Sequence, residues 1–250
     1  MARESIASRT EAGRIFLTAE WRYLAMLNYE VDQALLKSRV PAGTEIELFQ
    51  GRAFVSLVGF RFLRTLVRGL PIPFHRDFDE VNLRFYVRRC DAGEIKRGVV
   101  FIQEIVPRRA IAAIARRVYH ENYRALPMSH EIVDEGAGPQ VEYRWRLGHR
   151  SNRLAASGTG AAREIVEGSL EQFIAEHYWG YCAQPDGRTS EYHVAHPSWR
   201  VWDVASGEFS GDAEALYGAE FAAIVNRPPD SAILAEGSPV TVYSGRKLPR

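Results

Sequence analysis

Four polar side chains occupy every second position in one stretch of this chain, and their chemistry suits an acidic ligand. Glu80, Asn82, Arg84 and Tyr86 supply a carboxyl, an amide, a guanidinium and a phenol. A guanidinium can hold a carboxylate through two parallel charge-assisted hydrogen bonds, and a positioned carboxyl group can take up or release a proton. We therefore interpret the row as a candidate ligand site, with Arg84 as the anion anchor and Glu80 as the candidate catalytic acid or base.

The element that must position this row is a predicted strand. Val81, Leu83, Phe85 and Val87 alternate with the polar residues, and successive side chains of a strand point to opposite faces of its sheet. The carboxyl and the guanidinium are roughly 13 Å apart by strand rise, too far for a simple neighbour pair. On an open sheet the polar face would be solvated, in a packed core it would form a structural network, and inside a cone or barrel it would line a pocket.

A second group of candidates lies in the C-terminal half, where histidines are interspersed with aromatic residues. His177, Tyr181, His193 and His196 join the predicted ligand-binding set, because histidine exchanges protons near neutral pH and aromatic rings contact small ligands. Packing in an aromatic core is the alternative for each of them. We predict no metal site, because histidines three residues apart on a strand point to opposite faces and no HExxH pattern is present.

Many short strands and few helices are predicted around these residues. Asp32 and Ser169 have the side chains of helix N-caps, and a third helix is predicted over 109–119 from its apolar spacing. Glu104, on a predicted returning strand, either faces the same interior as Glu80 or pairs with an arginine across the sheet. The predicted strands cover 45–50 paired with 52–62, 78–87 with 98–106, 140–147 with 152–156, and then 178–182, 191–195, 201–205, 233–236 and 239–243.

The composition argues against several classes of function. The 32 Lys and Arg residues nearly balance the 31 Asp and Glu residues, so we predict no nucleic-acid or membrane partner. Cys90 and Cys182 form no CxxC pair that would indicate a zinc or disulfide framework. The N-terminus is charged, and no apolar run reaches the roughly twenty residues that span a bilayer. We expect a cytoplasmic protein with a flexible tail at 1–15 and a single domain at 16–250.

Three parts of the chain carry a resemblance to a known family. They are Leu35–Phe60 with its VPAGTE run, Glu80–Val87 followed by Gly98–Phe101, and Glu176–Tyr181 followed by Tyr192–Trp199. From about residue 16 onward the chain resembles the uncharacterised bacterial family often called YqjF-like, which belongs to the acetoacetate-decarboxylase-like superfamily. That family itself has no established function.

The resemblance implies a fold and the place of a site. The implied fold is mostly β (α+β), with a large antiparallel sheet forming a cone or partly closed barrel, flanking helices and an interior site. Acetoacetate decarboxylases have a glutamate in a Y-x-E stretch, and Phe78-Asp79-Glu80 looks like its counterpart. Their G-R-E-x-x-G-x-P-K-K stretch supplies a Schiff-base lysine, whereas the counterpart here, near Ala115–Tyr123, contains no lysine. An imine mechanism needs a primary amine, so we do not expect classical decarboxylase activity.

None of the three lysines of this chain is expected to replace the missing one. Lys37 falls on the first predicted helix, Lys96 near a predicted hairpin turn and Lys247 near the C-terminus. None of these is a natural interior position.

The sequence as a whole predicts a protein that binds a small organic acid or a related metabolite in an interior polar pocket, with no cofactor. Assembly into a homo-oligomer is compatible with the sequence. Two alternatives stay open. One is an enzyme that acts on such a ligand by acid–base chemistry without a Schiff base, and the other is a structural or interaction protein whose interior is filled.

Overall fold

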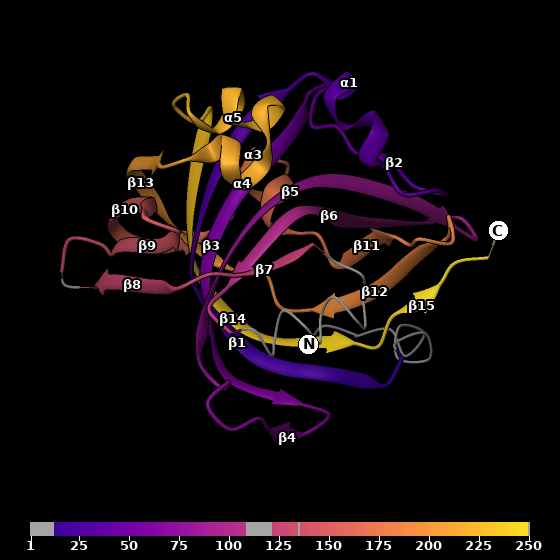
Figure 1. Cartoon of the computed structure of the whole chain (residues 1–250), viewed down its shortest axis with the longest axis horizontal. Helices are drawn as coiled ribbons and strands as arrows, with labels where there is room; N and C mark the ends of the chain where they lie inside the picture. Colours follow the sequence, from indigo (N-terminus) through magenta and orange to yellow (C-terminus); the bar gives the residue numbers. More distant parts are fainter. Residues whose placement is uncertain (1–12, 109–121, 135, 250) are drawn as a thin grey trace.

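One large mixed sheet dominates the structure, a computed structural model that describes residues 13–108, 122–134 and 136–249. Its main path runs in the order β15-β12-β11-β6-β5-β3-β1-β14-β13-β10-β9-β8. Figure 1 shows β5, β6, β11 and β12 arching over β1 and β14, with α4 and α5 near the top of the view. Most pairings are antiparallel, but β6 pairs in parallel with both β7 and β11.

The strands range from two-residue bridges to the long strands at the centre of the sheet. Their bounds are β1 Ile15–Val31, β2 Glu45–Ile46, β3 Ala53–Val67, β4 Leu70–Pro71, β5 Phe78–Asp91, β6 Glu94–Val106, β7 Tyr123–Ala125, β8 Met128–Val133, β9 Gln140–Leu147, β10 Arg150–Glu164, β11 Trp179–Ala183, β12 Thr189–Ala195, β13 Arg200–Ser210, β14 Ser231–Tyr243 and β15 Arg246–Lys247.

The helices are short, and side chains cap three of them. Their bounds are α1 Gln33–Leu36, the 3-10 turn η2 Lys37–Arg39, α3 Leu170–Ala175, α4 Ala213–Tyr217 and α5 Ala219–Val225. The predicted N-caps are confirmed: Asp32 accepts a hydrogen bond from the backbone of Ala34, and Ser169 accepts one from Gln172. These bonds satisfy backbone amides that lack a partner within the first helical turn.

The sheet curls until its distant parts meet. β12 pairs with β11 on one side and also with β14, at Val194↔Val242 and Ala195↔Thr241. Because this last ladder is only two residue pairs long, the sheet is partly closed and is not a complete barrel. The predicted mostly β fold with a curled sheet is confirmed, and the sheet is mixed instead of purely antiparallel.

Strand β5 lies between β3 and β6, and both of its faces are buried over Phe78–Val87. Val81, Leu83, Phe85 and Val87 are fully buried in the main apolar core. The alternate residues face the opposite side, where Asn82 lies across from Val58 of β3 and Glu104 of β6. The predicted alternation is therefore correct, and its polar face is directed into the molecule.

Several sequence predictions of local structure differ from the fold. The predicted hairpin between 45–50 and 52–62 is wrong: β2 pairs with Arg88 and Val87 of β5, and only Phe49 and Arg52 pair at the turn. The two strands predicted at 233–236 and 239–243 form one strand, β14, and β8, α4 and α5 were not predicted.

Two further predictions concern residues outside the described ranges. The helix predicted over 109–119 lies there entirely, as does the predicted N-terminal tail up to residue 12. The last residue of that tail, Ile15, begins β1.

Candidate functional site

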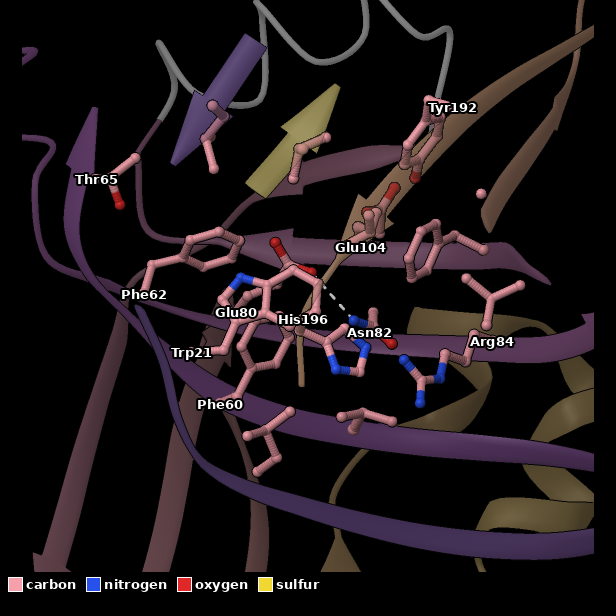
Figure 2. Close-up of a pocket in the computed structure, with 18 of the residues that line it drawn as sticks. Trp21, Phe60, Phe62, Thr65, Glu80, Asn82, Arg84, Glu104, Tyr192 and His196 are labelled. Atoms are coloured by element: carbon pink, nitrogen blue, oxygen red, sulfur yellow. Dashed lines mark hydrogen bonds between the residues drawn. The ribbon is translucent and has the colours of Figure 1, made fainter. Parts of the chain in front are cut away.

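A cavity of about 150 Å³ lies against the polar face of β5. Its wall is built by β1, β3, β5, β6, β7, β11, β12 and β14, and most of it is aromatic or aliphatic. Figure 2 shows Glu80, Asn82, Arg84 and His196 gathered in this cavity with Trp21. The polar residues of the wall include Glu80, Asn82, Arg84, Glu104, Tyr123, His177 and His196.

Glu80 is buried, and its carboxyl group accepts hydrogen bonds from two side chains. Asn82 Nδ2 donates to its Oε1 at 3.0 Å, and the Tyr123 hydroxyl donates to its Oε2 at 3.3 Å. Burial raises the pKa of Glu80 to about 7, against the opposing effects of these two bonds and of the Arg84 charge. A carboxyl group with this pKa can both hold and release a proton near neutral pH.

Arg84 is a buried guanidinium that lacks a carboxylate partner within the described ranges. Its Nη2 donates to the backbone oxygen of Ile174 at 3.3 Å and contacts Met26 Sδ at 3.9 Å. Its Nε, also buried, has no hydrogen-bond partner in the same part of the chain. The guanidinium lies over the Tyr86 ring, 5.7 Å from the centroid. Because arginine does not lose its charge in proteins, this side chain favours an anion in the cavity.

His177 belongs to a chain of three side chains, in which Glu47 and His177 are buried and Arg97 is half-buried. Its Nε2 lies 2.8 Å from Glu47 Oε2, and Arg97 Nε donates to the other oxygen of Glu47 at 2.6 Å. Burial is the main reason that the pKa of His177 falls to about 4. Burial also acts to raise the pKa of Glu47, but the bonds and charges of His177 and Arg97 outweigh it and lower that pKa. The histidine is therefore neutral beside an ionised carboxylate at neutral pH.

His196 is held against the aromatic part of the wall. Its ring stacks on Trp199 with centroids 4.3 Å apart and an interplanar angle of 15°, and its Nδ1 lies 2.9 Å from the backbone oxygen of Pro197. Burial is the main cause that lowers its pKa to about 4. At neutral pH this side chain contributes no charge to the cavity, and Arg84 is the one arginine or lysine among the described residues that line it.

The structure brings five of the eight predicted ligand-binding residues into the wall and places three elsewhere. Tyr86 extends past the cavity, and its hydroxyl lies 2.6 Å from Ser56 Oγ. Tyr181 packs over Gly98 in the main core. His193 stacks between Trp179 and Tyr243, with centroid distances of 4.8 and 5.4 Å.

None of the three lysines lines the cavity. Lys37 and Lys247 are exposed, as expected, but the expectation that Lys96 is not an interior residue is wrong, because it is only 2% exposed. Its Nζ lies 2.8 Å from Asp91 Oδ2 and 4.5 Å from the Trp179 ring centroid. Val99 of β6 lines the cavity. Lys96 is three positions before it on the same strand, so its side chain points to the opposite face of the sheet, away from the cavity.

Sequence reasoning missed three residues of the site. The indole of Trp21 lines the cavity, and its Nε1 is buried without a partner in the described structure. Tyr123 reaches Glu80 from β7, and Glu47 lies 130 residues from the histidine that it contacts. None of the three belongs to a periodic pattern that links it to β5.

Comparisons with known proteins relate this chain to an uncharacterised protein by sequence and to a group of solved structures by fold. The curated protein YqjF of Bacillus subtilis (strain 168), itself uncharacterised, is 28% identical over 165 residues, which are 63% of this chain and 64% of YqjF. The match thus spans less than two thirds of that relative.

No helix within the described ranges has the length and apolar character needed to cross a membrane.

Solved structures with a similar fold are acetoacetate-decarboxylase-like. An acetoacetate decarboxylase-like enzyme from Sphingomonas wittichii RW1 has a TM-score of 0.65 at 13% identity, with 93% of each chain covered. The acetoacetate decarboxylase of Legionella pneumophila also has a TM-score of 0.65 at 13% identity, covering 94% of this chain and 88% of that one. The enduracididine biosynthesis enzyme MppR, solved with pyruvate, has a TM-score of 0.67 at 13% identity, covering 96% and 92%. At these identities the likeness establishes the fold alone.

The family assignment rests on a match that covers most of the chain. Residues 18–241 match the family DUF2071, described as an uncharacterized conserved protein. This range contains β5 and every residue of the polar row. The chain therefore belongs to the DUF2071 family and has the fold of acetoacetate-decarboxylase-like enzymes.

Proposed function

We propose that this protein binds a small organic acid in the cavity, with Arg84 as its anchor. The observation that carries the proposal is the buried guanidinium of Arg84, which lies in the cavity wall with no carboxylate partner in the described residues. A permanent charge in such a place is stabilised when an anion enters, and a carboxylate matches the two-pronged geometry of the guanidinium. The binding of pyruvate by MppR, a protein of similar fold, agrees with a ligand of this class.

The size of the cavity restricts the ligand to a few non-hydrogen atoms. At about 150 Å³, it is comparable with the engineered cavity of about 150 Å³ that accepts benzene, and well below the roughly 300–1,000 Å³ of sites for larger ligands. Its aromatic and aliphatic wall favours a short apolar body attached to the carboxylate. A short-chain monocarboxylic acid meets both requirements.

A second candidate function is catalysis by acid–base chemistry on the same ligand. The observation that favours it is Glu80, whose pKa of about 7 suits proton transfer and which lies two positions from Asn82 and four from Arg84 on one wall. A Schiff-base mechanism has no support, because no lysine of this chain lines the cavity. The protein would then move a proton on a bound acid without forming a covalent intermediate.

The experiment that tests the proposal compares two arginine variants from the same strand. Arg84→Met keeps much of the side-chain bulk and removes the charged fork, whereas Arg88→Met removes an exposed arginine that pairs with Glu45. Binding of propionate, lactate and pyruvate to each protein is measured by isothermal titration calorimetry. Loss of a buried charge pair costs roughly 2–5 kcal/mol, so Arg84→Met should weaken binding by at least about thirtyfold, while Arg88→Met should bind like the wild type.

Folding must be checked alongside binding, because a structural role of Arg84 is the competing explanation. If Arg84 serves only to hold the fold, the Arg84→Met protein melts at a lower temperature and the wild-type protein binds none of the acids. Unchanged affinity in folded Arg84→Met protein removes Arg84 from the site. Failure of every small monocarboxylate to bind the wild type refutes the proposal.

A further inference from the structure

The hydrogen bonds of Glu47 determine which nitrogen of His177 carries the proton. Glu47 accepts from Arg97 at one oxygen and lies 2.8 Å from His177 Nε2 at the other. A carboxylate in this arrangement accepts, so Nε2 must be the protonated nitrogen of the neutral ring. The other nitrogen, Nδ1, is then a bare acceptor.

This acceptor is buried beside the proposed anion anchor. His177 Nδ1 is shielded from solvent and has no hydrogen-bond partner in the described residues, and the ring lines the cavity. The rings of His177 and Tyr86 have centroids 4.7 Å apart, and the Arg84 guanidinium lies over the same Tyr86 ring at 5.7 Å. The ring that carries the acceptor and the anchor therefore both contact one aromatic ring. Asn82 Oδ1, a second buried acceptor without a described partner, lies on the other side of Arg84 along β5.

We infer that the acid bound in this cavity is a short-chain hydroxy acid, whose carboxylate is held by Arg84 and whose hydroxyl donates a hydrogen bond to His177 Nδ1. This inference rests on the proposed function and specifies its ligand class. A keto acid offers only acceptors to the cavity, so it leaves the histidine nitrogen unsatisfied. An unsubstituted acid does the same, whereas a hydroxyl supplies the missing donor. A buried site with an acceptor in place discriminates strongly against ligands that cannot donate to it.

The test uses four acids of nearly equal size that differ in one substituent. Lactate (each enantiomer separately), pyruvate, alanine and propionate are titrated into the wild-type protein by calorimetry at neutral pH. One enantiomer of lactate should bind at least about tenfold more tightly than pyruvate, alanine or propionate. Equal or tighter binding of pyruvate or propionate overturns the inference but leaves the proposed function standing. Tighter binding of alanine also overturns it, because the donor would then be an ammonium group.

A pair of histidine variants locates the source of the preference. In His177→Phe a flat ring of similar size remains, but it carries no acceptor in place of Nδ1. This variant should lose the preference for lactate over propionate. The matched control is His193→Phe, on β12 and outside the cavity wall, which should keep the preference.

The outcomes separate the two proposals. A full lactate preference in folded His177→Phe protein overturns the role of His177. If that variant does not fold, the wild-type panel alone decides the ligand class. If no acid binds the wild type, both the inference and the proposed function fail together.

Discussion

Replacing Glu80 by Gln should make the protein more stable at alkaline pH, although a charged residue is lost from a candidate active site. Glu80 is 3% exposed, and its pKa rises from the ordinary value of 4.5 to about 7 because burial disfavours the charged form. Glutamine resembles the protonated carboxyl in shape and cannot ionise. The substitution therefore removes the cost of holding a charge in the cavity wall.

The magnitude follows from proton linkage. Between pH 4.5 and about 7 the unfolded state has released the Glu80 proton and the folded state still holds it, so stability falls as the pH rises through this interval. Each pH unit costs ~1.4 kcal/mol, and the whole interval sums to roughly 3 kcal/mol. Above pH 7 the free energy of unfolding of the wild type is lowered by this full amount, whereas that of Glu80→Gln is not.

The assay is urea denaturation of both proteins from pH 4 to pH 8.5, in buffers without carboxylate ions that would occupy the cavity. The difference in free energy of unfolding, variant minus wild type, should rise by up to roughly 3 kcal/mol between pH 4.5 and 7 and then level off. Taking the difference cancels the titration of the histidines. Glu94→Gln, at an exposed position at the start of β6, gives the baseline for removing a carboxylate from the surface.

A flat difference curve would refute this reasoning, because it would mean that Glu80 titrates alike in both states. A curve that falls with pH would show that the ionised carboxylate stabilises the fold, and the network of Asn82, Tyr123 and Arg84 would then outweigh burial. In either case Glu80 would no longer be poised for proton transfer near neutral pH.

Three further predictions test other parts of the structure. The Glu80→Gln variant, which lacks the opposing titration of Glu80, should lose stability as the pH falls from 6.5 toward 4, because burial lowers the pKa values of His177 and His196 to about 4 and the unfolded chain binds their protons first; melts of this variant that do not change over this interval would contradict it. Lys96→Met should cost about 2 kcal/mol in urea denaturation, because it removes a buried ammonium group that contacts Asp91 and lies 3.9 Å from the fully buried carboxylate of Glu191, and a loss below about 1 kcal/mol would show that neighbouring arginines compensate. Borohydride treatment with acetoacetate should trap no adduct by mass spectrometry, since no lysine lines the cavity, and a stoichiometric adduct on any lysine would overturn the absence of imine chemistry.

The sequence alone determined the local features of this protein. Alternation along Phe78–Val87 placed Glu80, Asn82 and Arg84 on one face of a strand, and the structure has them there. The capping side chains of Asp32 and Ser169 marked two helix starts correctly. These features depend on backbone geometry over a few residues, so a short window of sequence contains the information needed to predict them.

Only the tertiary structure decided that the polar face of β5 is an interior wall. The same alternation would fit a strand whose polar face is solvated. The polar face is interior because the sheet curls until β12 pairs with β14, as at Val194↔Val242. The partners of the wall residues also come from distant parts of the chain, as Glu47 and His177 do. β2 pairs with β5 and not with its neighbour β3, and Lys96 is buried by Trp179 from another strand. Such pairings are selected by the free energy of packing the whole sheet, which no periodic pattern in the sequence encodes.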